Sequence, residues 1–151
     1  MDGDRSAQLD RLVDEDDLDG VLALVRAGGV AEAWLRYHRP GDRDADDPDF
    51  WAVQLFWSQS LFADRATHRD LIRRLVDGSP DDDVLGCVSA GPLEDFLSAD
   101  EDELRWVEEQ AAQSERFRAA LAGVWRSEDL PHEAFARLER AAGQPPPRPD
   151  R

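Results

Sequence analysis

The stretch PDFWAVQLFWSQSLFA, residues 48–63, is the most apolar part of the chain and holds five of its twelve aromatic residues. On a helix these apolar side chains point nearly all the way round, a pattern typical of a helix inside a bundle. We therefore expect a largely buried helix here, with Trp51 and Trp57, and Trp125 further on, serving stability. Gln54 and Ser58, one turn apart between apolar neighbours, are expected either to be buried and hydrogen-bonded or to line a cavity.

Helix-forming residues dominate the remaining sequence, and no segment shows the sustained apolar–polar alternation of a strand. The pattern predicts an all-α fold, an irregular helical bundle or short solenoid of about seven to nine helices. The first helical stretch is expected over residues 6–27, interrupted within 14–20 and stopped by Gly28-Gly29, and the second over 30–38. The last helix is expected over 133–142.

The middle of the chain contains three patterns that predict the start of a helix. They are Thr67 with Asp70, Ser79-Pro80-Asp81, and Asp100 with Glu103, and Gly91-Pro92 is expected to separate two short helices. Apolar side chains at helical spacing follow these signals: Leu71, Ile72, Leu75 and Val76; Val84, Leu85 and Val88; Leu104, Val107 and Ala111; and Phe117, Leu121, Val124 and Trp125.

The length of 151 residues favours one helical domain over residues 1–143, and the proline-rich residues 144–151 are expected to form a disordered tail. The single cysteine, Cys87, excludes an intrachain disulfide and a cysteine-rich metal site, and it favours a reducing cytoplasm. The acidic first ten residues do not resemble a secretion signal, and no apolar run is long enough to span a membrane.

The charge is strongly negative, because 34 acidic residues face 18 basic ones, all of them arginine, for a net charge of −16. Residues 1–50 alone carry 14 acids and six arginines. Nucleic acids and anionic lipids bind through cationic groups, so this charge disfavours a direct nucleic-acid or membrane partner and favours a basic protein partner. The absence of lysine and asparagine and the single isoleucine indicate a GC-rich genome, so the arginine bias carries no functional signal.

The clusters of titratable residues have plain structural interpretations. Residues 42–49 begin like a calcium-binding loop, but Asp47 stands where that loop needs glycine and Val53 where it needs glutamate, which leaves a solvated linker. Asp81-Asp82-Asp83 suits a first helical turn. The spacing of His38, His68 and His132 fits no zinc motif, and Cys87 lies on an apolar helix face. We expect no cofactor and no metal, and the missing catalytic motifs favour a non-enzyme without deciding the point.

Two acids and three arginines form a separate candidate group. Glu94 and Asp95 follow Gly91-Pro92, and Arg116, Arg118 and Arg126 come later in the chain. An ion pair between the two sets would tie two helices together, and a ligand site is the alternative.

Two blocks resemble a known bacterial family. Residues 90–97 read AGPLEDFL and residues 117–125 read FRAALAGVW, and the segments 34–37, WLRY, and 50–52, FWA, are similar as well. The chain resembles, over about residues 33–141, a family described only as a domain of unknown function, number six-eight-six-nine in that series. The resemblance implies an all-helical bacterial domain and transfers no activity, substrate or catalytic residue. Residues 65–70 depart from the family pattern, which has a proline and a tryptophan there.

The leading functional hypothesis is a non-enzymatic, acidic protein–protein interaction module, of the immunity or inhibitor kind among other possibilities. One alternative is a nucleic-acid mimic, whose carboxylates would stand in for phosphates. Another is a small-ligand binding protein or enzyme with a pocket near Gln54, Ser58, Glu94 or His68. The oligomeric state stays open. The candidate ligand or partner residues are Gln54, Ser58, His68, Glu94, Asp95, Arg116 and Arg118.

Overall fold

The computed structural model describes residues 2–26, 28–39, 47–57, 64–124 and 130–143. Every regular element within these ranges is helical, which confirms the all-α class. The chain forms two compact units, Met1–Pro80 and Asp81–Arg151, which are described separately below. The prediction of one domain over residues 1–143 stays a prediction, and the tail at 144–151 lies outside the described residues.

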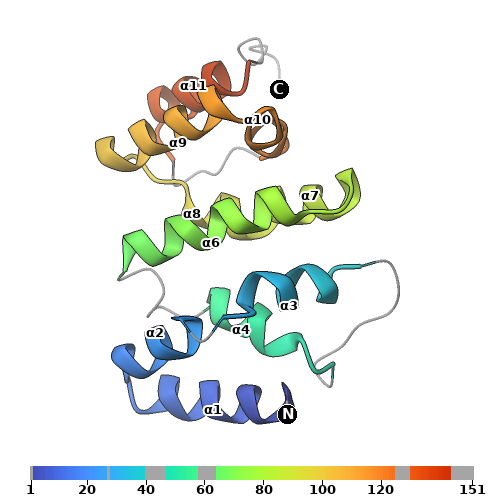
Figure 1. The fold of residues 1–151 in the computed structure, drawn as a ribbon. Coiled ribbons are helices and arrows are strands. Elements are labelled where there is room, and N and C mark those ends of the chain that lie inside the picture. Colours follow the sequence, from blue (N-terminus) through green and yellow to red (C-terminus); the bar gives the residue numbers. More distant parts are fainter. Residues whose placement is uncertain (1, 27, 40–46, 58–63, 125–129, 144–151) are drawn as a thin grey trace. The chain divides into compact units, whose positions relative to one another are not determined.

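The first unit contains α1 (Asp2–Asp14), α2 (Leu18–Arg26), α3 (Val30–Tyr37), α4 (Phe50–Trp57) and α6 (Arg65–Gly78). Helix α1 packs against α2 and α4, and α3 packs against α4 and α6 (Figure 1). Helix α4 thus lies between α1 and α3, as its apolar sequence predicts.

The expected break in the first helical stretch separates α1 from α2. Asp16 has a left-handed backbone, with φ of 55°, and ends the run of α-helix. Asp17 then caps α2, because its Oδ1 accepts a hydrogen bond from the Gly20 amide at 2.9 Å. The predicted stop at Gly28-Gly29 is also confirmed, since both glycines have positive φ, 93° and 86°, in the turn into α3.

The core of the first unit gathers around the indole of Trp34, which meets the edge of Phe56 with ring centroids 6.4 Å apart. Trp51 is 1% exposed and confirms that most of α4 is buried. Trp57 does not fit this pattern: 64% of it is exposed, so the expectation that it is a core residue is wrong. It occupies the last described position of α4, beyond the part of that helix enclosed by its neighbours. Ser58 and Trp125 lie outside the described residues.

The predicted start of α6 at Thr67 is wrong. Asp64 is the N-cap, and its Oδ1 accepts a hydrogen bond from the Thr67 amide at 3.0 Å. Thr67 therefore stands at the third helical position, where its backbone N–H is the group that needs a partner.

The next helix begins two residues later than predicted. Asp81, and not Ser79, accepts from the Val84 amide, at 2.9 Å. The buried hydroxyl of Ser79 instead donates to the carbonyl oxygen of Leu75 at 2.7 Å, closing the end of α6. The third signal is confirmed, because Asp100 caps α9 by accepting from the Glu103 amide at 3.2 Å.

The second unit contains α7 (Asp82–Val88), the π-helical segment η1 (Ser89–Leu93), α8 (Glu94–Phe96), α9 (Glu101–Gln113), α10 (Glu115–Ala122) and α11 (His132–Ala141). Gly91-Pro92 does not separate two helices, contrary to the sequence prediction, because η1 joins α7 to α8 without a break. Proline has no N–H to offer the α-helical ladder, and the wider π-turn accommodates that missing donor inside a continuous helix.

The core of the second unit is built on three aromatic rings. Trp106 meets Phe96 and Phe117 edge to face, with centroid distances of 5.3 and 5.8 Å. The predicted apolar faces surround them, with Val84, Leu85, Val88, Leu104, Val107, Ala111, Phe117 and Leu121 all buried. Helix α10 packs on η1, and α9 packs on α10 and α11.

Candidate functional site

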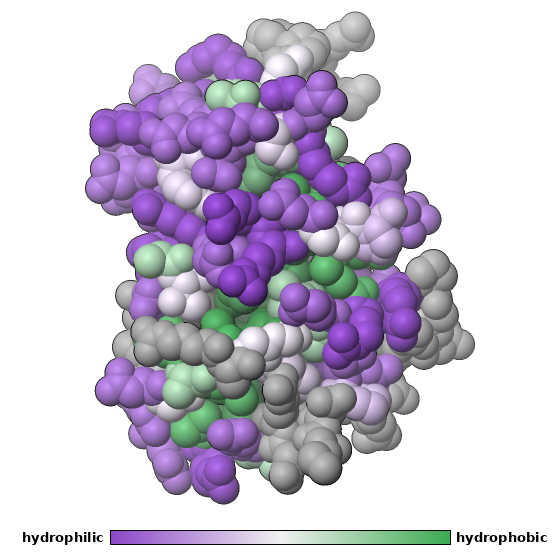
Figure 2. Space-filling model, viewed as in Figure 1, coloured by the Kyte–Doolittle hydropathy of each residue, from purple (hydrophilic) through white to green (hydrophobic). Residues whose placement is uncertain are grey.

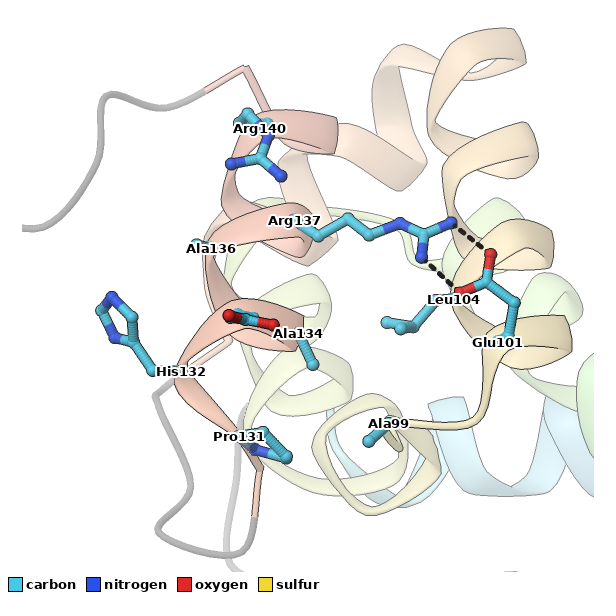
Figure 3. Close-up of a pocket in the computed structure, with 10 residues that line it drawn as sticks. Ala99, Glu101, Leu104, Pro131, His132, Ala134, Ala136, Arg137 and Arg140 are labelled. Atoms are coloured by element: carbon cyan, nitrogen blue, oxygen red, sulfur yellow. Dashed lines mark hydrogen bonds and ion pairs between the residues drawn. The ribbon is translucent and has the colours of Figure 1, made fainter.

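The largest described pocket lies in the second unit, between α9 and α11, with a volume of about 540 Å³ (Figure 3). Leu104 and Ala134 give it an apolar floor, and Pro131 and Ala99 lie near its lower end in the figure. The pocket forms because α11 begins at His132 and runs alongside α9.

The side chain of Arg137 crosses this pocket and joins α11 to α9, and we call this set of contacts the arginine clasp. Arg137 of α11 donates two hydrogen bonds to the Glu101 carboxylate of α9, Nη1 to Oε2 at 2.6 Å and Nη2 to Oε1 at 3.1 Å. Its Nη2 also donates to Oε1 of Glu108, two turns of α9 further on, at 2.6 Å. The hydrogen bond that Glu101 accepts from Arg137 lowers the pKa of Glu101. The hydrogen bonds that Arg137 donates to Glu108 and Glu101 raise the pKa of Arg137.

The chemistry available in this pocket is limited. Two carboxylates of the same unit already satisfy the charge of Arg137, so the guanidinium offers little to an incoming anion. His132 points away from Arg137 in Figure 3, and Arg140 is exposed. In the described part of the chain, no three histidine, cysteine or acidic side chains come together as metal ligands would. The clasp therefore acts as a structural tie between α9 and α11.

Two smaller pockets are also described. One of about 380 Å³ lies in the first unit between the α2–α3 turn and α6, where Asp70 is paired with Arg73 and Arg74. The other, about 140 Å³, lies in the second unit among apolar side chains that include Phe135 and Leu138. One carboxylate oxygen of Glu139, which lines this pocket, is buried without a hydrogen-bond partner.

The first group of predicted site residues is not gathered around a described pocket. Gln54 is half-buried, and its Nε2 donates a long hydrogen bond, 3.4 Å, to Oδ1 of Asp10 on α1. The other amide atom of Gln54, Oε1, is buried without a hydrogen-bond partner. His68 is 1% exposed within α6 and lines no described pocket, and Ser58 lies outside the described residues.

The second predicted group is also not brought together. Arg118 donates to the carbonyl oxygen of Ala111 at 2.6 Å and lies 3.8 Å from Glu115, so it serves the α9–α10 junction. Glu94 and Asp95 make no ion pair with an arginine in the described ranges, so the expected helix-to-helix pair is not found with Arg116 or Arg118. Arg126 lies outside the described residues, and a pair with it stays a prediction. Asp95 is exposed, and partial desolvation by its surroundings raises the pKa of its carboxyl group. Arg116 is half-buried on α10.

The remaining titratable residues have local roles. The ring of His38 stacks on Trp34 with centroids 3.7 Å apart, and its Nδ1 lies 2.9 Å from the Trp34 carbonyl oxygen. Burial lowers the pKa of His38, although this hydrogen bond opposes the shift. Burial also raises the pKa of the half-buried Cys87, and the charges of Asp83 and Asp81 add to the effect.

A cluster of acidic residues between α1 and α2, which we call the acidic turn, was not among the predicted site residues. We define it as Asp14, Glu15, Asp16 and Asp19, which lie around the α1–α2 junction, are exposed, and form no ion pair with another residue that the structure describes. From the sequence, these acids are predicted to interrupt a helix, and they contribute to the negative charge of residues 1–50. In the view of Figure 2, hydrophilic side chains cover α9 and α11, whereas hydrophobic atoms reach the surface over α1 beside hydrophilic ones. A sequence signal was available, because residues 2–26 carry eight acids and three arginines.

Comparison with known proteins places the chain by family alone. A model of a family of unknown function, DUF6869, matches residues 38–145, which include the AGPLEDFL and FRAALAGVW blocks. No curated protein and no solved structure matches the chain. Among the described helices, none has the length and apolar character that crossing a membrane requires.

Proposed function

The chain belongs to the family of unknown function DUF6869, and we propose that it is a non-enzymatic interaction module whose acidic surface binds a basic partner protein. The observation that carries this proposal is the acidic turn, whose exposed carboxylates are paired with no arginine in the described part of the chain. Unpaired surface charge of one sign steers a partner of the opposite sign and sets the orientation in which it binds.

The use of the arginines supports this proposal. Many described arginines are paired with acids of the same unit: Arg36 with Asp49, Arg73 and Arg74 with Asp70, Arg105 and Arg137 with Glu101, and Arg118 with Glu115. These pairs neutralise acids elsewhere on the surface. The negative charge of the acidic turn therefore stays uncompensated and available to another molecule.

Some acids of the turn region have a structural use, and they are not counted in the proposed surface. Asp17 caps α2, and Asp10 accepts the hydrogen bond from Gln54. The members of the acidic turn make no such contact within the described residues. Acids kept at a surface without a structural use fit a binding role better than a stabilising one, because like charges repel.

The two alternative functions have less support. A nucleic-acid mimic needs acids in a regular surface array, but several described acids are N-caps or ion-pair partners: Asp64, Asp81, Asp100, Asp49, Asp70 and Glu101. An enzyme needs convergent reactive groups, and the largest described pocket has its arginine held by two carboxylates. More specifically, we propose that this small, acidic, helical chain is an inhibitor or immunity protein of the bacterial cytoplasm.

A capture experiment with matched charge variants tests this function. The tagged full-length chain is incubated with lysate of its own organism, and the bound protein is identified and purified for binding measurements. The variant Asp14→Asn/Glu15→Gln/Asp16→Asn removes three charges with little change of shape, and asparagine tolerates the left-handed backbone at residue 16. We expect slower association and a weaker salt dependence than for the wild type.

The control removes three exposed acids from the second unit, as Asp82→Asn/Glu109→Gln/Glu133→Gln. This variant has the same net charge as the turn variant, so it separates a local surface from the overall charge. Equal binding by the two variants, or a complex that is insensitive to salt, would overturn the proposal.

A further inference from the structure

Trp57 and Val13 are the two large hydrophobic side chains that stand exposed among the described residues, by 64% and 43%. The Trp57 indole has a ring contact with Phe50, whose edge-to-face geometry places the centroids 5.7 Å apart. That contact leaves most of the indole in water, at a cost in hydrophobic free energy that a purely structural tryptophan would avoid.

The two side chains belong to helices that pack on each other, α4 and α1. The hydrogen bond between Gln54 and Asp10 ties these helices together, and both run in the same direction from it (Figure 1). Trp57 comes three residues after Gln54, and Val13 three residues after Asp10. The two apolar side chains therefore lie toward the same end of the helix pair, on the side where α1 leads into the acidic turn.

The charged residues near Trp57 and Val13 indicate which kind of partner surface could contact them. Asp14 follows Val13 directly, and Glu15 and Asp16 continue the acidic turn. A partner surface must therefore be apolar where it meets Trp57 and Val13 and cationic where it meets the carboxylates. An arginine or lysine can also lie over the indole face, because the electron-rich ring attracts a cation.

We propose that Trp57 and Val13 form an apolar anchor, bordered by the acidic turn, for a basic amphipathic segment of a partner protein. This inference rests on the proposed function, since it names the kind of partner that the acidic surface receives. Tryptophan is enriched among the few interface residues that dominate binding energy, and charged groups around such an anchor set the association rate. The acidic turn then attracts the segment, and Trp57 holds it.

Synthetic peptides provide the test on the full-length chain. The probe is an amphipathic leucine–arginine peptide, compared with a serine–arginine peptide of equal charge and a leucine–glutamate peptide. We expect the leucine–arginine peptide to bind most tightly and to shield Trp57 from acrylamide quenching, measured as the difference between the wild type and Trp57→Phe. The Trp57→Ser variant is expected to bind it about 30-fold more weakly, almost entirely through faster dissociation.

Folding and ring chemistry are controlled by two further variants. Trp57→Ser should unfold at nearly the wild-type temperature because the side chain is mostly exposed. Trp57→Phe should recover part of the affinity, since it restores an apolar ring without the larger indole.

The outcomes separate the anchor from the proposed function. If Trp57→Ser binds the leucine–arginine peptide as tightly as the wild type while the turn variant weakens it, the anchor is wrong and the acidic surface stands. If the turn variant changes nothing, or no arginine peptide binds the wild type, the proposed function itself fails. A dimer of the free chain that Trp57→Ser dissociates would show that the anchor is covered by a second copy, which also overturns the inference.

Discussion

The hydroxyl of Ser89 donates a hydrogen bond of 2.6 Å to the carbonyl oxygen of Ala120, joining η1 to α10 inside the second unit. Its Oγ also lies 3.1 Å from the Leu85 carbonyl oxygen in the preceding turn. Gly123 allows this approach, because a Cβ there would come within 3.0 Å of the Ser89 Oγ. Ser89 directly precedes the AGPLEDFL block, and Ala120 and Gly123 belong to the FRAALAGVW block, so the two regions are joined here by close packing.

Removing the Ser89 hydroxyl should destabilise the second unit modestly. The Ala120 carbonyl oxygen still accepts from the Gly123 amide at 3.1 Å, so it is not left without a partner in Ser89→Ala. We expect a loss of about 0.5–1.5 kcal/mol in the free energy of unfolding. Urea titration followed by circular dichroism would measure it, and no loss would mean that the hydrogen bond contributes nothing.

Adding a methyl group at Gly123 should test the close packing directly. Gly123→Ala places the new Cβ 3.0 Å from the Oγ and 3.1 Å from the Cβ of Ser89, so the Ser89 side chain must shift slightly to make room. The expected cost is about 1–3 kcal/mol. Gly91→Ala is a matched control, because a Cβ at Gly91 meets nothing within 4 Å. Equal costs at both glycines would contradict the account.

The N-cap of α6 allows a test of where this helix begins. Asp64→Ala removes the acceptor of the Thr67 amide and should cost about 1 kcal/mol of stability. Thr67→Ala should cost less, because the structure uses the backbone and not the side chain of that residue as the capped group. The opposite order of the two losses, measured by thermal unfolding, would restore the start that the sequence alone predicted.

The pH dependence of stability should carry a contribution from His38. Burial against Trp34 lowers its pKa below the ordinary 6.5, so the unfolded chain binds the proton more tightly than the folded one. The His38 contribution is complete above pH 6.5, and it declines as the pH falls from there toward the folded-state pKa. His38→Gln should flatten this part of the profile, and an NMR titration of the imidazole with a midpoint above 6.5 would refute the assignment.

Cys87 should react slowly with alkylating reagents in the folded protein. Burial, Asp83 and Asp81 all raise the pKa of its thiol above the ordinary 9.0, so the reactive thiolate is scarcer than in a free cysteine. Iodoacetamide labelling at pH 8 should accelerate on denaturation. Asp83→Asn should accelerate labelling of the folded chain slightly, whereas Asp102→Asn, on α9, should not.

Local residue order decided much of the fold. Gly28-Gly29 ends one helical stretch because glycine adopts positive φ without steric cost, and Asp100 begins another because its carboxylate accepts free amides. The apolar faces at helical spacing were predicted because burial follows that spacing wherever a helix forms. The acidic composition pointed to a basic partner for the same kind of reason, since net charge is a property of the residues themselves.

The remaining features were decided only by the tertiary structure, because they depend on contacts between residues far apart in the sequence. Trp51 and Trp57 share the same apolar run, yet the neighbouring helices bury one and leave the other in water. Pro92 looked like a helix stop, but a π-turn packed on α10 carries the helix through it. Arg137 meets Glu101 across 36 positions of chain, a pairing that no spacing rule contains. The anchor of Trp57 and Val13 likewise exists because α1 packs on α4.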